Sequence, residues 1–148
     1  MFKKIMSTLM GVAFLLCVSA SQSVVVAEES LADTKIVLQI SDPNPFKQTL
    51  VLNVAGNLKR ILGPDNVDVE IVAFGPGLRL LMADNANKQR IQGLVGSGVR
   101  FSACEVTLSK MTKLLGNKPQ LNKNAVVVNG GVIRIVELMN KGYKLIKP

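Results

Sequence analysis

The sequence contains no histidine and no tryptophan, and only two cysteines, Cys17 and Cys104. Without histidine the chain cannot form a Ser-His-Asp triad, a Cys-His pair or a His-ligated metal site. Two cysteines this far apart cannot form a zinc finger or a CxxC redox motif. The chemistry must therefore depend on few residues, and we expect neither a metal ion nor a cofactor.

The first 27 residues have the features of a secretory signal peptide. Lys3 and Lys4 precede an apolar run of 14 residues that is too short to span a bilayer. The sequence Val25-Val26-Ala27 suits cleavage after Ala27, with cleavage after Ala20 or an uncleaved anchor as alternatives. We predict an exported, periplasmic protein that has no membrane association once residues 1–27 are removed.

The chain is basic, with a net charge of +8. Its lysines and arginines are scattered, and aromatic residues make up only 4% of the sequence, so no stacking surface for bases is indicated. We therefore predict no nucleic-acid binding. Export would also remove Cys17, which leaves Cys104 as the single thiol and excludes an internal disulfide.

Predicted strands and helices alternate through the rest of the chain. Residues 28–34 form a polar lead-in, and residues 35–148 form a single domain. We predict strands over 35–40, 67–74, 99–103, 125–128 and 144–147, and helices over 45–62, 78–84, 87–95, 105–115 and 132–141. This order implies βαβ crossovers and an α/β fold of three layers, with a mostly parallel sheet and helices on both faces.

The first and last predicted helices carry more apolar residues than one contact face needs. In the first helix we expect the core stripe to contain Leu50, Val54, Leu58, Ile61 and Leu62, which Val51 and Leu52 then widen. The last helix likewise has apolar residues on two faces. This surplus predicts a homo-oligomer, and the alternative is that all of these residues pack inside one domain.

Candidate site residues fall where the predicted strands end, because ligands of open α/β sheets bind beyond the carboxyl ends of the strands. Cys104 ends a strand and begins a helix, whose free N–H groups favour a thiolate. Glu105 would oppose this effect if its carboxylate pointed inward. The alternative for Cys104 is an inert, buried cysteine. Possible pocket residues at the same edge are Asn44, Gly75, Glu105, Asn129 and Gly130.

Several runs of the sequence carry a resemblance to a known family. They are Gly98-Val-Arg-Phe-Ser-Ala-Cys104 with Thr107-Leu108, and Val132-Ile-Arg-Ile-Val-Glu-Leu138 with Gly142-Tyr143 and Ile146-Lys147-Pro148. With the opening Ile36 to Ile40 and the helix Phe46 to Leu62, they make most of residues 35–148 similar to the DsrE/DsrF-like sulfur-relay proteins.

The resemblance implies a small three-layer α/β fold that assembles as a homotrimer or homohexamer. It also implies that Cys104 carries sulfur as a persulfide and exchanges it with a sulfur donor or acceptor protein. Two features depart from the family pattern: Glu105 is an acid beside the thiol, and the export signal takes the chain away from the cytoplasmic relays.

Three hypotheses about function follow. The first is an exported sulfur carrier or sulfurtransferase that uses Cys104. The second is a non-catalytic, oligomeric binding module with a small-ligand pocket at the strand ends, and the third is a structural protein with an inert cysteine. Exposure of Cys104 separates them, because a carrier needs an accessible sulfur, so a buried sulfur excludes the first hypothesis and leaves the other two.

Overall fold

The structure, a computed structural model, describes residues 30–148, so the predicted signal peptide and Cys17 lie outside the described residues. Strands and helices alternate along the described chain. In order they are β1 (Thr34–Ile40), α1 (Pro45–Leu62), β2 (Val67–Ala73), the 3₁₀ helix η1 (Gly75–Leu81), α2 (Lys88–Gly96), β3 (Val99–Cys104), α3 (Glu105–Leu115), β4 (Ala125–Val128), α4 (Gly131–Asn140) and β5 (Lys144–Ile146). None of the helices within residues 30–148 has the length and apolar character needed to cross a membrane.

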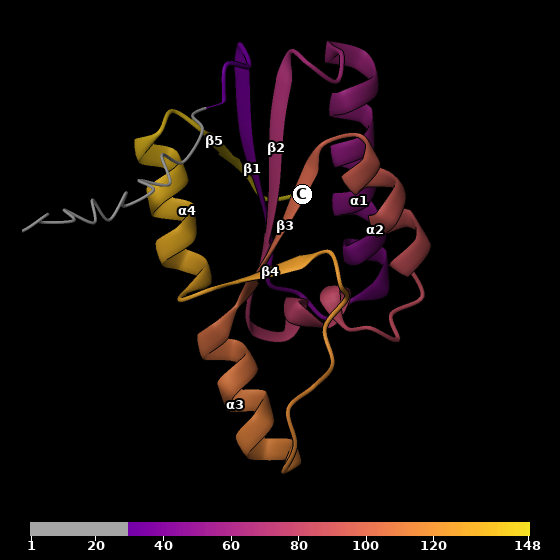
Figure 1. Ribbon diagram of the computed structural model, residues 1–148, viewed down its shortest axis with the longest axis vertical. Coiled ribbons are helices and arrows are strands. Elements are labelled where there is room, and N and C mark those ends of the chain that lie inside the picture. Colours follow the sequence, from indigo (N-terminus) through magenta and orange to yellow (C-terminus); the bar gives the residue numbers. More distant parts are fainter. Residues whose placement is uncertain (1–29) are drawn as a thin grey trace, which may run out of the picture.

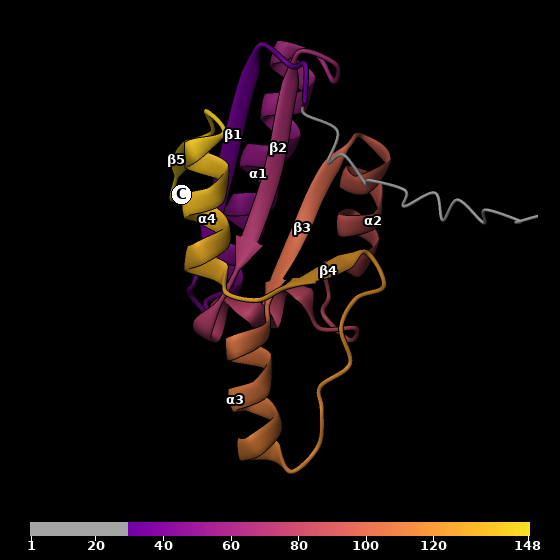
Figure 2. The same cartoon turned by 60° about the vertical axis from the view of Figure 1, so that its left-hand side comes forward.

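The five strands form one sheet in the order β4-β3-β2-β1-β5, and every neighbouring pair is parallel. Helices α1 and α2 cover one face of the sheet and α4 covers the other (Figure 1). Helix α3 projects beyond the edge where the strands end, as a second view also shows (Figure 2). The predicted three-layer α/β fold is therefore confirmed, with a sheet that is parallel throughout.

Each face of the sheet has its own core, because neighbouring residues of a strand point to opposite faces. Val69 and Ile71 of β2 belong to the large apolar cluster beneath α1 and α2. Val72 belongs to a smaller cluster under α4, together with Val37, Ile135, Leu138 and Tyr143. The same alternation places Asp68 and Glu70 on the α4 side, in the interior of a fully buried strand.

The apolar stripe expected for α1 was only partly right, because Val54 and Leu58 of that stripe pack against the core but its other members do not. The buried apolar residues of this helix are Val51, Leu52 and Ala55, whereas Leu50 and Ile61 are exposed. The helix carries apolar residues around much of its circumference, so its periodicity fits more than one buried face. The position of the sheet decides which face is used.

The helical segment after β2 begins earlier than predicted. Gly75-Pro-Gly77 was expected as a loop before a helix at Leu78, but η1 already begins at Gly75. Gly77 passes so close to the end of β1 that a Cβ atom there would lie 2.5 Å from the carbonyl oxygen of Ile40. Only glycine allows this approach, and it closes the chain over the carboxyl end of β1.

Candidate functional site

Cys104 lies where two helices begin. It is the last residue of β3 and the N-cap residue of α3. Strand β4, whose residue Val128 pairs with Cys104, leads into α4, and the N–H of Gly131 in the first turn of α4 also reaches this thiol. Both helices therefore direct the positive ends of their dipoles toward this thiol.

Polar groups from both helices surround the sulfur. Burial alone would raise the pKa of the Cys104 thiol, but the hydroxyl of Thr107 and the N–H groups of Thr107, Gly131 and Val106 outweigh burial and bring it below its ordinary value. Cys104 makes no side-chain capping hydrogen bond to α3, so these groups act mainly by stabilising negative charge on the sulfur. The arrangement favours a thiolate.

Thr107 is held by a second contact. Its Oγ1 accepts a hydrogen bond of 2.8 Å from the N–H of Gly75, so its own proton is available to the sulfur of Cys104. Thr107 is the third residue of α3, the position from which a side chain reaches back to the start of a helix. Sequence reasoning did not select Thr107 as a site residue, although its spacing from Cys104 could have indicated it.

Access to the thiol is limited. Cys104 is buried, with a relative exposure of 5%. Gly131 is also buried and packs against Phe74, where a Cβ atom on Gly131 would lie 2.8 Å from Cβ of Phe74. Because a sulfur carrier needs an accessible sulfur, this burial counts against the carrier hypothesis and favours the binding-module and structural hypotheses.

The predicted pocket residues do not form one pocket. Gly75 lies near the thiol because its N–H donates a hydrogen bond to Thr107. Gly130 is the N-cap residue of α4 and immediately precedes Gly131. Asn44 instead caps α1 by accepting the N–H of Phe46 at 2.9 Å. Glu105 is exposed and lines a cavity of about 280 Å³ with Leu108 and Val127.

Asn129 is an exposed residue of the turn between β4 and α4. Of the five predicted pocket residues, then, the two glycines stand close to the polar groups around the sulfur. Glu105 points away into solvent and is not among the groups that shift the pKa of the Cys104 thiol. The opposing effect of this acid, which the sequence left open, is therefore smaller than the effects of Thr107, Gly131 and Val106.

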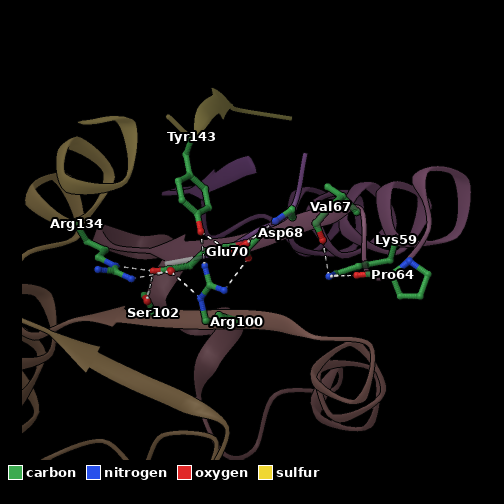
Figure 3. A network of polar contacts seen from close by, with 11 residues as sticks. Lys59, Pro64, Val67, Asp68, Glu70, Arg100, Ser102, Arg134 and Tyr143 are labelled. Carbon is green, nitrogen blue, oxygen red and sulfur yellow. Dashed lines mark hydrogen bonds and ion pairs between the residues drawn. The ribbon is translucent and has the colours of Figure 1, made fainter. Parts of the chain in front are cut away.

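A buried ion cluster joins strands β2 and β3 to α4 (Figure 3). Alternation along β3 places Cys104 on the same side of the sheet as Arg100 and Ser102 of this cluster. The carboxylate of Glu70 is 1% exposed and accepts two bonds from Arg134, at 2.7 and 2.8 Å. It also accepts the hydroxyl of Ser102 at 2.6 Å and Nε of Arg100 at 3.1 Å. Burial alone would raise the pKa of Glu70, but these bonds and the two guanidinium charges lower it, so Glu70 is ionised.

The cluster continues along the strands to the carboxylate of Asp68. Arg100 donates to Asp68 at 2.6 Å, and the hydroxyl of Tyr143 donates to its other oxygen at 2.6 Å. Burial, together with the bond to Asp68, raises the pKa of Tyr143 to about 12. No buried side-chain polar atom within residues 30–148 lacks a partner. The two acids and two arginines balance each other in charge.

Sequence reasoning missed this cluster, although one signal was present. Asp68 and Glu70 stand two residues apart in an otherwise apolar strand, where alternation places both on one buried face. Buried carboxylates need cationic partners. The partner arginines lie 30 to 64 residues away in sequence, so the pattern alone could not identify them.

A larger cavity lies beyond the sheet, beside η1 and α3. It has a volume of about 650 Å³ and an apolar wall formed by Met82, Met111 and Leu115, with Arg79 and Asp84 among its polar lining residues. None of the residues selected from the sequence lines it.

The fold and the position of Cys104 define the class of protein. No protein-family model matches the sequence, and no curated protein matches it. The structure, however, matches solved structures with the DsrE/DsrF-like fold. They include the ychN protein from E. coli, at 14% identity and a TM-score of 0.60, covering 78% of this chain and 99% of that one. Another is BT1422 from Bacteroides thetaiotaomicron, at 18% identity and a TM-score of 0.54, and this match covers 77% of this chain and 94% of that one.

A third match is nearer in sequence. MTH1491 from Methanobacterium thermoautotrophicum, a protein of unknown function, is 30% identical with a TM-score of 0.70, and the match covers 78% of this chain and 100% of that one. The chain therefore belongs to the same family as MTH1491, within the DsrE/DsrF-like fold. The fold implied by the sequence resemblance is thereby confirmed.

Proposed function

We propose, despite the burial of Cys104 in the single chain, that the protein carries sulfane sulfur as a persulfide on this residue. The observation that carries this proposal is the convergence of Thr107 and the N-termini of α3 and α4 on one sulfur atom. An inert cysteine in an apolar core needs no such surroundings, and its thiol pKa would rise rather than fall.

The chemistry requires no base, which suits a chain without histidine. The Cys104 thiolate attacks the outer sulfur of a donor persulfide, R–S–SH. A bond forms between the two sulfurs, the donor S–S bond breaks, and the donor leaves as the thiolate RS⁻. The N–H groups and the Thr107 hydroxyl then stabilise the charge of the perthiolate. An acceptor thiolate regenerates Cys104 by the same exchange in reverse.

Replacing Cys104 with serine should abolish sulfur uptake. We expect the wild type to gain mass in steps of one sulfur atom after treatment with inorganic polysulfide or thiosulfate, and to lose it again with reductant. Intact-mass measurement provides the readout. The mature chain lacks Cys17, and where residues 1–27 are retained, Cys17→Ser is the matched control that should retain uptake. A wild type that never gains sulfur, or a Cys104→Ser variant that gains as much, would contradict the proposal.

The burial of Cys104 favours a second candidate, the non-catalytic binding module. In that case the cavity beside η1 and α3, with its Met82, Met111 and Leu115 wall, is the place for a small apolar ligand at the strand ends. The mass experiment also separates these two functions, because a folded wild type without sulfur uptake supports the binding module.

We further propose that the chain forms a homotrimer or homohexamer. Exposed apolar residues support this: Val132, Ile133, Val136 and Met139 on α4, and Val126 on edge strand β4. Light scattering at micromolar concentration should give three or six times the chain mass, and Ile133→Glu should lower it. Leu31→Glu is a matched control in the lead-in and should change nothing. A monomer mass for the wild type would refute the assembly.

The exported, periplasmic location is likewise a proposal, supported by the sequence features of residues 1–27. N-terminal sequencing should find the mature chain beginning near Glu28. Retention of Met1 in a cytoplasmic product would exclude export.

A further inference from the structure

The buried carboxylate of Glu70 joins two elements that meet at Cys104. Ser102, which donates to this carboxylate, is two residues before Cys104 in β3. Arg134, which makes two bonds to it, is three residues after Gly131 in α4. The contacts of Glu70 therefore fix β3 and α4 relative to each other close to the thiol.

We propose that Glu70 and Arg134 are positioning residues for Cys104, because their two-bond contact holds the first turn of α4 with the Gly131 N–H beside the sulfur. The inference rests on the proposed function only in taking Cys104 as the reactive group. It adds that the contact between Glu70 and Arg134, neither of which is among the groups around the sulfur, controls how readily the Cys104 thiol ionises.

The geometry of the pair suits this role. Nε and a terminal nitrogen of Arg134 bind the two separate oxygens of Glu70, at 2.7 and 2.8 Å. A planar guanidinium held at two points fixes orientation as well as distance. Gly131 lies one turn earlier on the same helix and is pressed against Phe74, so a rotation of α4 would move its N–H group from the sulfur.

Stability alone does not account for the pair. Removing two charges from water carries a large desolvation cost, and well-packed apolar residues often stabilise a fold equally well. Beyond the ion cluster this face is apolar, with Val37, Val72, Ile135 and Leu138 buried under α4. A carboxylate in the middle of β2 is therefore better explained by what it holds in place.

The ionisation of Cys104 depends mainly on backbone N–H groups, because the charged side chains near it are paired or exposed. Strand β4, its neighbour in the sheet, carries no charged residue. Helix α3 contributes Glu105, which is exposed. On the side of Cys104, Arg100 of β3 and Arg134 of α4 are paired with Asp68 and Glu70 of β2, so these charges balance. A displacement of α4 should therefore act on the thiol mainly by removing the N–H group of Gly131.

The experiment is a pH profile of Cys104 alkylation by iodoacetamide, followed by intact mass in the full chain with Cys17→Ser. We expect Arg134→Lys, which keeps the charge, to shift the midpoint to higher pH, and Glu70→Gln to shift it less, because the unpaired guanidinium charge of Arg134 favours the thiolate. The midpoint is the measured quantity, since a loosened α4 could by itself speed alkylation. Arg134→Lys decides the question if Glu70→Gln does not fold, as judged by circular dichroism.

Two controls separate positioning from a loss of stability. Glu137→Gln removes the surface partner of Arg134, at 3.5 Å, and should leave the midpoint unchanged. Asp68→Asn disrupts the far end of the same cluster, away from Arg134, and should also leave it unchanged. An unchanged midpoint in the folded Glu70 and Arg134 variants, or an equal shift in Asp68→Asn, would overturn the inference. No sulfur donor enters this test, so failed sulfur uptake would reject the proposed function and not this inference.

Discussion

Replacing Glu70 with alanine should lower the free energy of unfolding by about 3–5 kcal/mol, because the change leaves buried positive charge without its counter-ion. Arg134 loses both of its short bonds, and Ser102 and Arg100 each lose a partner. Urea unfolding followed by circular dichroism measures the effect. A total stability of about 5–15 kcal/mol is usual for a domain, so this loss would be a large share of it.

The matched control is Glu137→Ala. Glu137 also pairs with Arg134, but at 3.5 Å and with a side chain that is 54% exposed. Exposed ion pairs contribute about 0–1 kcal/mol, so this variant should unfold at nearly the wild-type urea concentration. If both variants lost the same small amount, the buried cluster would not have the strength assigned to it.

Gly77→Ala should lower the free energy of unfolding by about 3 kcal/mol, because its methyl group would overlap backbone atoms. The new Cβ would lie 2.5 Å from the oxygen and 2.6 Å from the carbonyl carbon of Ile40, and 2.7 Å from Cα of Ser41. Backbone atoms at the end of a buried strand cannot move aside as a flexible side chain can. Thermal or urea unfolding should show the loss directly.

Gly93→Ala provides the opposite case within the same chain. Gly93 lies inside α2, and a Cβ atom there would meet nothing within 4 Å. Alanine favours a helix over glycine by about 0.5–1 kcal/mol, so this variant should be slightly more stable than the wild type. A Gly77→Ala variant as stable as Gly93→Ala would show that the close approach of η1 to β1 does not constrain the fold.

The two predictions concern the supports of the candidate site. Gly77 lies in η1, which begins at Gly75, and the N–H of Gly75 holds Thr107 beside Cys104. Glu70 holds the other helix that reaches the sulfur. Both supports are internal to one chain, so the surroundings of the thiol form without a partner.

Much of the fold follows from local features of the sequence. The apolar run before residue 41 predicts a buried strand, and Asn44 with Pro45 begins a helix that ends before Gly63 in the structure as predicted. Alternating strands and helices then require a parallel sheet, since parallel strands need crossover connections. The same topology predicts that Cys104 lies at the end of a strand and the beginning of a helix, where the structure places it.

Only the tertiary structure decided the rest. The buried face of α1 depends on where the sheet lies, because its apolar residues permit more than one choice. The partners of Glu70 lie up to 64 residues away, and Gly131 reaches Cys104 only after β4 has paired with β3. The burial of the thiol and the lowering of its pKa arise from these contacts. Local sequence patterns indicate the periodicity and the ends of helices and strands. The protonation state of a buried ionisable group depends instead on all the residues packed around it.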